Sequence, residues 1–310
     1  MANLPKEQID VAKLQEFANL ELLAKAVVEG TMVGLHKSPF HGFSVEFLEH
    51  RQYNPGDSIR NIDWKLFART EKLFVKKYEE ETNLRCHVLM DTSSSMVYPQ
   101  GDYNKFHFSI YSAAALTYLL NRQRDATGMT FFSDQIEESF PPRSTTAHRR
   151  LLFTEMEKRL RNQEEQKKNK KTATAQVLHE IAETISKRSL IILFSDMMDT
   201  TDDQDKVISA LQHLKYNKHQ VILFHVMDKE SELNFDFENR PYNFVDMETG
   251  EQIKAFPGEI REKYLDYIKQ YHHEIQLKCG QFGIEYVQAD IQEGFRQIIL
   301  PFLKKRARMM

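Results

Sequence analysis

The feature that most constrains the fold is a rhythm that begins after Glu81. Short, nearly continuous apolar runs alternate with longer segments in which apolar residues recur at helical spacing. Continuous apolar runs predict strands buried on both faces, and helices between them predict parallel crossover connections. We therefore predict an α/β fold with a doubly wound, mostly parallel sheet. The strands are expected at 86–90, 128–132, 190–194, 221–226 and 284–287.

Helical periodicity fills the segments between these runs. A short alternating segment, 136–140, predicts an edge hairpin strand, and residues 234–255 predict a hairpin insert with Gly250 at its turn. At the other end of the chain, apolar residues spaced from Val11 to Val27 predict an amphipathic helix that ends at Gly30. The remaining helices are expected at 106–122, 147–161, 175–187, 205–216, 259–279 and 291–306.

Residues 36–81 differ in composition from the rest of the chain. They are dense in charged and aromatic residues and contain the turn sequence Asn54-Pro55-Gly56-Asp57. We predict two domains: residues 1–81, an N-terminal helix plus a mixed appendage, and residues 82–310, the α/β domain. Trp64, the only tryptophan, is expected to be a packed anchor. The polar residues of 51–69 are expected to form either an exposed recognition patch or an ion-pair network, and the sequence does not decide between them.

Charge and composition exclude several classes of function. The formal net charge is −3, so the chain lacks the basic excess that nucleic-acid binding needs. Cys86 and Cys279 lie in strand and helix patterns, which predicts buried thiols in a reducing compartment. No segment approaches the ~20 apolar residues of a membrane span, and the first residues lack the apolar core of a signal peptide. We expect a cytoplasmic protein.

Polar side chains gather where two predicted strands end. Asp91, Ser93 and Ser95 follow the first strand, and Asp196 follows the strand at 190–194. The carboxyl ends of parallel strands meet at the ligand-binding edge of a sheet, and alternate residues of an extended segment point the same way. Thr172 lies just before the predicted helix that precedes the strand at 190–194, so its side chain can reach the same crevice. Such oxygens suit a hard divalent cation, Mg²⁺ first and Mn²⁺ or Ca²⁺ as alternatives.

Other interpretations of these residues remain open. The segment after the first strand can simply turn the chain and cap the next helix. Asp91 can also be a nucleophile, as in haloacid dehalogenase-like hydrolases and phosphatases, although Ser93 stands where they carry a second carboxylate. A third alternative is a metal-free structural scaffold. Three further carboxylates are expected to cap or to be solvated: Asp199, Asp202 and Asp203.

Neither the histidines nor the remaining motifs indicate a class of enzyme. The chain has no Gly-x-Ser-x-Gly elbow, no glycine-rich phosphate loop and no Cys or His pair at zinc spacing. His87 and His225 lie inside strand patterns and are predicted to be core histidines. His272 lies on a polar helical stretch and is expected at the surface.

The oxygen-bearing residues resemble the metal-ion-dependent adhesion site of von Willebrand factor type A domains. In that site an Asp-x-Ser-x-Ser motif follows the first strand, a threonine lies in the middle of the chain, and an aspartate follows a later strand. Lys171 and Ala175 stand where such domains usually carry glycine. The resemblance implies a partner's carboxylate on the cation and these ligands: Asp91, Ser93, Ser95, Thr172 and Asp196.

A second resemblance extends over nearly the whole chain. The segments 46–64, 68–70, 73–76 and 78–81, which include Tyr53-Asn54-Pro55-Gly56-Asp57 and Asp63-Trp64, resemble the bacterial family called domain of unknown function 58. That resemblance implies a von Willebrand factor type A-like fold with an N-terminal extension, often encoded beside a MoxR-type AAA+ ATPase, and no established enzymatic activity. We therefore expect a non-catalytic, metal-dependent protein-interaction module that works with such an ATPase.

Overall fold

The structure is a computed structural model, and it describes residues 19–35, 49–52, 64–77, 84–162, 174–185, 188–198, 204–216 and 218–307. The chain divides into two compact units, Gly34–Asn83 and a larger unit that joins Met1–Val33 to Leu84–Met310. The described N-terminal helix therefore groups with the α/β unit. Our predicted boundary at residue 81 placed that helix with the appendage instead.

The smaller unit is a short antiparallel pair with one helix. Strand β1 (Glu49–Gln52) pairs with β2 (Phe74–Lys77), and α3 (Trp64–Thr70) lies between them in the sequence. Trp64 is 56% exposed and contacts the ring of Phe67 edge-on at 6.1 Å between centroids. The prediction that Trp64 is a packed anchor is therefore wrong. The two hypotheses for the polar residues of 51–69 stay predictions, because several of those residues lie outside the described ranges.

The larger unit is built on a six-stranded sheet with the order β10-β7-β6-β3-β4-β5. Every neighbouring pair is parallel except β4 and β5, which are antiparallel. A mixed α/β fold with a mostly parallel central sheet is thereby confirmed. The strands are β3 (Arg85–Asp91), β4 (Ala126–Phe132), β5 (Ile136–Arg143), β6 (Leu190–Ser195), β7 (Gln220–Met227) and β10 (Glu285–Asp290).

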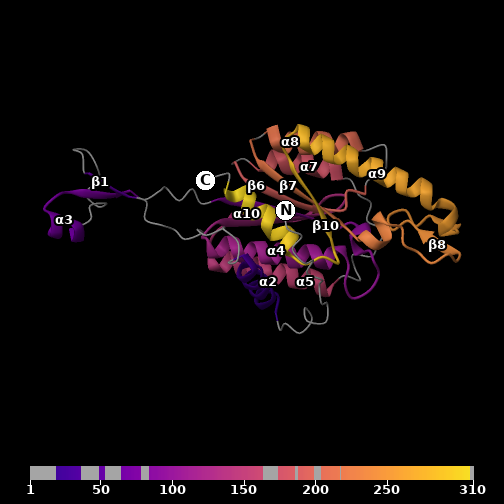
Figure 1. Ribbon diagram of the computed structural model, residues 1–310, viewed down its shortest axis with the longest axis horizontal. Helices are drawn as coiled ribbons and strands as arrows, with labels where there is room; N and C mark the ends of the chain where they lie inside the picture. The colour runs from indigo at the N-terminus through magenta and orange to yellow at the C-terminus, as the bar shows by residue number, and fades with distance from the viewer. Residues whose placement is uncertain are drawn as a thin grey trace. The chain divides into compact units, whose positions relative to one another are not determined.

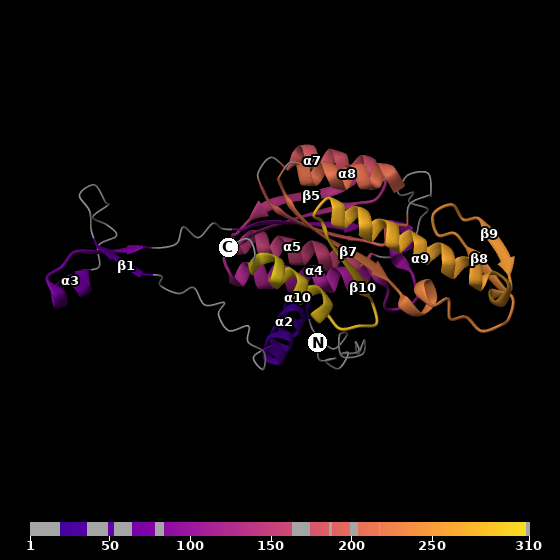
Figure 2. The ribbon, with the colours of Figure 1, turned by 45° about the horizontal axis from the view of Figure 1, so that its top comes forward.

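Helices cover both faces of this sheet, as Figures 1 and 2 show. The helices α7, α8 and α9 lie on one face, and α4, α5 and α10 lie on the other. Among the described helices none is long and apolar enough to cross a membrane. Their bounds are α4 (Lys105–Arg122), α5 (Thr146–Arg161), α7 (Thr174–Thr184), α8 (Gln204–Tyr216), α9 (Pro257–Gln281) and α10 (Arg296–Ala307).

Burial on both faces explains the continuous apolar runs of the sequence. Leu89, Leu193 and Leu223 pack into the cluster formed with α7, α8 and α9. Their neighbours along the strands, such as Ile192 and Ile222, are fully buried as well, and strand alternation points them toward the opposite face. In strands with two buried faces most positions are apolar, with exceptions such as the buried His87 and His225, and polar residues become frequent only at the sheet edge. The polar residues that follow β3 and β6 therefore lie at that edge.

The N-terminal helix α2 (Leu20–Leu35) ends later than predicted and packs against α5. The Leu20 amide donates to Glu157 Oε1 at 2.9 Å, and Arg149 pairs with Glu21 at 3.4 Å. We predicted that Gly30 ends this helix, but the helix continues for five more residues. Glycine costs a helix about 1 kcal/mol, and burial of the adjoining apolar turn, including Val28, offsets that cost.

The predicted hairpin insert is confirmed as β8 (Tyr242–Val245) paired with β9 (Gln252–Ala255). Gly250 has a positive φ of 75°, which glycine adopts without strain, and its amide donates to the Asp246 carbonyl. A one-turn π-helix, η4 (Lys229–Leu233), connects β7 to this insert.

His87 and His225 are buried as predicted, but the expectation for His272 was wrong. That side chain is buried, and its ring stacks on His225 at 4.6 Å between centroids. Many residues on the outer face of α9 are polar. The sequence pattern of this helix therefore did not show that His272 faces the sheet.

Candidate functional site

The candidate site lies where the strand order of the sheet reverses. From β3 the chain continues outward to β4 and β5, and it then returns to place β6 on the other side of β3. Met90 and Phe194 are paired in the parallel register, so the residues that follow them, Asp91 and Ser195, end neighbouring strands. A crevice for ligands forms at such a reversal, beyond the carboxyl ends of the strands.

Asp91 is a buried carboxylate held by two hydrogen bonds. Its Oδ1 accepts from the Ser93 amide at 2.9 Å, and its Oδ2 accepts from the Ser195 hydroxyl at 2.7 Å. Burial raises the pKa of Asp91 to about 7, and the nearby negative charge of Asp196 adds to the increase, while these hydrogen bonds oppose it. A cation bound beside this carboxylate would therefore stabilise the ionised form of Asp91.

Ser93 and Ser95 place their hydroxyls beside this carboxylate. Their Oγ atoms lie 3.0 Å apart. We predicted that an extended segment turns both side chains the same way, but Ser95 lies in a 3₁₀ turn, η2 (Ser94–Val97), for which Ser93 is the N-cap. The turn, and not strand alternation, brings the two hydroxyls together.

Asp196 is buried on the other side of the crevice. Its Oδ2 accepts from Lys105 Nζ at 2.7 Å, its Oδ1 accepts from the Met198 amide at 3.3 Å, and Ser95 also hydrogen-bonds to it. Burial acts to raise the pKa of Asp196, but the Lys105 ammonium outweighs burial and the pKa lies below its ordinary value. Asp196 is therefore the ionised member of the pair at neutral pH.

Four of the five predicted metal ligands thus come together, and the fifth cannot be placed. Asp91, Ser93, Ser95 and Asp196 are linked by the contacts above. Thr172 lies outside the described residues, as do three carboxylates that we expected to cap or to be solvated: Asp199, Asp202 and Asp203.

The oxygens present fit a small, hard cation. An octahedron with metal–oxygen distances of about 2.1 Å has neighbouring oxygens roughly 3.0 Å apart. Ser93 Oγ and Ser95 Oγ, which hydrogen-bond to each other, have that separation. Within the ranges that the structure describes, no three His, Cys, Asp or Glu side chains gather into a potential metal cluster. Two carboxylates with hydroxyls suit Mg²⁺ better than a softer ion such as Zn²⁺.

Sequence reasoning missed two members of this site, Lys105 and Glu232. Lys105 begins α4 and Glu232 lies in η4; Lys105 Nζ donates to Glu232 Oε1 at 2.6 Å. A lysine in the first turn of a helix opposes the helix dipole, which favours negative charge there. That mismatch at Lys105 was a signal in the sequence. For Glu232 the sequence held no comparable signal, because acidic residues are common in such connections.

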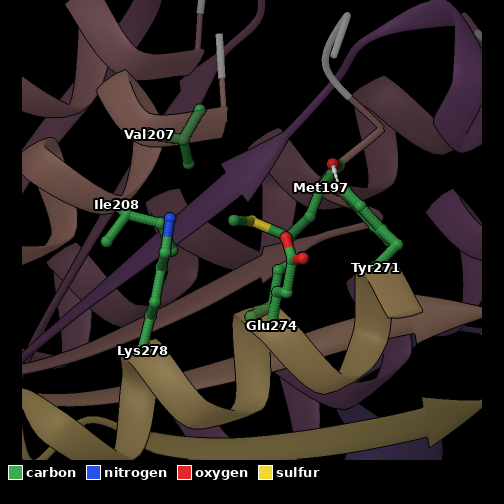
Figure 3. Close-up of a pocket in the computed structure, with 7 residues that line it drawn as sticks. Met197, Val207, Ile208, Tyr271, Glu274 and Lys278 are labelled. Atoms are coloured by element: carbon green, nitrogen blue, oxygen red, sulfur yellow. Dashed lines mark hydrogen bonds between the residues drawn. The ribbon is translucent and has the colours of Figure 1, made fainter. Parts of the chain in front are cut away.

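A small apolar hollow lies next to the site, between α8 and α9 (Figure 3). Met197, directly after Asp196, forms one side of it, and Ile208 and Lys278 line it from the two helices. Met197 has a positive φ of 52°, and the Tyr271 hydroxyl donates to its carbonyl oxygen. Helix α9 thus holds the backbone of the residue that follows Asp196.

Two solved structures resemble the chain. A conserved hypothetical protein, BatB, from Bacteroides thetaiotaomicron is 13% identical with a TM-score of 0.41, and the match covers 71% of this chain and 99% of that one. An aerotolerance-related membrane protein from Bacteroides fragilis NCTC 9343, crystallised with multiple mutations to serines, is 14% identical with a TM-score of 0.42. The match covers 72% of this chain and 99% of that one.

Curated relatives have no described function. Uncharacterized proteins from Mycobacterium tuberculosis (Rv1480) and Mycobacterium bovis (Mb1516) are each 27% identical over 134 residues, which is 43% of this chain. The match spans 42% of the length of these relatives.

The family comparison extends further along the chain. The family described as "Protein of unknown function DUF58" matches residues 49–274, which include both strands that carry the candidate site. The chain belongs to this DUF58 family.

Proposed function

We propose that the site at the ends of β3 and β6 holds a divalent cation, Mg²⁺ in the first place, and through it a carboxylate of a protein partner. The observation that carries this proposal is the meeting of Asp91, Asp196 and two hydroxyl oxygens 3.0 Å apart at the reversal of the strand order. Asp91, Ser93 and Ser95 would hold the ion, with Asp196 and Thr172 completing the set. A bound cation supplies an electrophilic position for an oxygen of the partner.

A binding role is proposed instead of a catalytic one because the polar groups of the site are engaged with each other. Both oxygens of Asp91 accept hydrogen bonds from Ser93 and Ser195. The ring of the buried histidine of β7, His225, hydrogen-bonds through Nδ1 to the Tyr286 hydroxyl at 2.8 Å and also to the backbone of Asp196, so both contacts occupy it and it is not placed as a base for these serines. In this proposal the chain is a von Willebrand factor type A-like module with an N-terminal appendage, and the strand order is compatible with that fold.

The proposed partner is a MoxR-type AAA+ ATPase in the cytoplasm. This part rests on the family resemblance alone, because genes of such ATPases often accompany the family. The sequence of the chain supports it only through the metal site that a partner's carboxylate would complete.

The cation is tested by thermal unfolding. Titration of Mg²⁺ or Mn²⁺ into the chelator-treated protein should raise its melting temperature, since a ligand that binds only the folded state stabilises it. Asp91→Ala should abolish the rise. Asp290→Asn is the control, because Asp290 ends the edge strand β10 and is not one of the proposed ligands. An unchanged melting temperature in the wild-type protein would remove the cation from the proposal.

The partner is tested by capture of the candidate ATPase on the immobilised full chain, with and without chelator. Binding should be lost on chelation and in Asp91→Ala, and kept in Asp290→Asn. Binding that survives both treatments would favour the alternative of a metal-free scaffold.

The remaining alternative is an Asp91-dependent phosphatase. In that hypothesis Asp91 is the nucleophile, and Lys105 and Asp196 lie at the same end of the sheet. Position 93, where such enzymes carry a second carboxylate, is a serine whose hydroxyl contacts Ser95. Turnover of generic phosphomonoesters by the wild-type protein, lost in Asp91→Asn, would establish this activity.

A further inference from the structure

Two histidines from neighbouring helices meet outside the site described above. His179 lies in α7 and His213 lies in α8, 34 residues apart in the sequence, and their Nδ1 atoms are 3.0 Å apart. Both side chains are half-buried, so solvent reaches the pair. The two helices lie side by side on one face of the sheet (Figures 1 and 2). An ion bound between these rings would therefore link α7 to α8.

Apolar packing holds the helix segments that carry the two rings. Leu178 precedes His179 and Leu214 follows His213, and both leucines are fully buried in the core cluster that α7 and α8 form with the sheet. Ligands on packed helices keep their separation better than ligands on loops. Binding of an ion to this pair therefore has little backbone to order.

In the metal-free protein the two rings share a hydrogen bond, in which one Nδ1 donates and the other accepts. A neutral imidazole carries one protonated and one bare nitrogen. When the donating ring carries its proton on Nε2 instead, both Nδ1 atoms are bare and can bind a metal. Imidazole nitrogens suit Zn²⁺, Cu²⁺ and Ni²⁺, whereas Mg²⁺ prefers oxygen.

The separation of the two rings fits a tetrahedral ion. With Zn–N bonds of about 2.05 Å, two imidazoles on a tetrahedral Zn²⁺ have ring centroids roughly 5.2 Å apart and coordinating nitrogens about 3.3 Å apart. The ring centroids of His179 and His213 are 5.2 Å apart, and their planes are tilted by 44°. A small rotation of each ring widens the Nδ1 separation from its present 3.0 Å without a movement of the helices.

We infer that His179 and His213 form a Zn²⁺ site that joins α7 to α8. Over the described parts of the chain no third His, Cys, Asp or Glu gathers with them, so water completes the coordination. Glu183 is exposed one turn along α7 from His179 and adds a negative charge on the same helical face. Two protein ligands make a reversible site, weaker than the four-ligand sites of structural zinc. This inference does not depend on the proposed Mg²⁺ site.

The test is calorimetric titration of Zn²⁺ into the full chain, with excess Mg²⁺ to compete for the oxygen site. His179→Gln and His213→Gln should each weaken Zn²⁺ binding about tenfold or more, because a single ligand loses the effective concentration of the second. The double variant should bind no more weakly than either single variant, since residues that share one site are not additive. His273→Gln is the matched control, because His273 is an exposed histidine of α9, and it should leave the affinity unchanged.

Co²⁺ reports the geometry, since a tetrahedral Co²⁺ ion absorbs visible light far more strongly than an octahedral one. The wild-type protein and His273→Gln should show the intense band, and both single variants at positions 179 and 213 should lack it. Melting temperatures measured without Zn²⁺ show whether each variant folds, and one folded single variant is enough for the comparison.

The contrary outcomes are distinct. A Zn²⁺ affinity in folded His179→Gln or His213→Gln equal to that of the wild-type protein would overturn the inference. So would a loss of part of the bound Zn²⁺ in each single variant and of all of it in the double variant, because the two histidines would then bind separate ions. A failure of Mg²⁺ to stabilise the protein would refute the oxygen site and leave the histidine site standing.

Discussion

Removal of the buried charge at Asp91 should stabilise the metal-free protein in a pH-dependent way. Asp91→Asn keeps the shape of the side chain and an acceptor for the Ser93 amide, but it cannot ionise. Burial and the charge of Asp196 raise the pKa of Asp91 from 3.8 to about 7 in the folded state. The folded wild-type protein therefore binds a proton that the unfolded chain has released, between about pH 4 and 7.

The sign and size of the effect follow from this difference. Where the folded state binds more protons than the unfolded state, the free energy of unfolding falls as pH rises. One pKa unit corresponds to about 1.4 kcal/mol. The ionisation of Asp91 should therefore cost the wild-type protein about 2 to 3 kcal/mol more at pH 8 than at pH 5, and Asp91→Asn should not have this loss.

Urea denaturation in chelator at the two pH values measures the difference. The advantage of Asp91→Asn over the wild-type protein should grow by that amount from pH 5 to pH 8, and contributions of other groups cancel because both proteins share them. Mg²⁺ at pH 8 should recover the loss in the wild-type protein alone. An equal stability difference at both pH values would refute a raised pKa at Asp91.

Three further predictions concern the rest of the fold. Asp125→Ala should lower the free energy of unfolding by about 3–5 kcal/mol in urea, because it leaves the buried guanidinium of Arg306 without its partner; an effect under 1 kcal/mol would contradict that pairing. Gly128→Ala should cost about 1–3 kcal/mol and lower the melting temperature, because its Cβ would lie 2.6 Å from a carbonyl oxygen of β5. Cys86 and Cys279 should resist iodoacetamide in the native protein and react in urea, because burial raises the pKa of both thiols, for Cys279 to about 12; rapid native labelling would contradict their burial.

The parts of the fold that could be predicted are those that a single local pattern determines. Five strands of the large sheet were recognised because each is an apolar run, and the sixth, β5, because its residues alternate; the structure places all six within a few residues of the prediction. Errors lie at helix ends, where tertiary contacts decide. α2 continues through Gly30, which adjoins the buried Val28, and α10 begins at Arg296 and not at Ile291.

The candidate site was predictable only in its residues that follow strands. Asp91 and Asp196 were found because the carboxyl ends of parallel strands share one edge. The partner of Asp196, Lys105, comes from the start of α4, 91 residues away in the sequence, and the second partner of Lys105, Glu232, comes from η4. No local pattern links residues that far apart, so the internal ion pairs needed the structure.

The outer strand β5 limits how another protein can attach to this sheet. Pro141 and Pro142 remove two backbone donors from it, and Glu137 and Glu138 are tied to Arg159. An incoming strand needs a row of free amides to extend a sheet, and prolines and charges on an edge oppose that pairing. The β5 margin therefore disfavours β-augmentation and fibril-like stacking of copies along this side of the sheet.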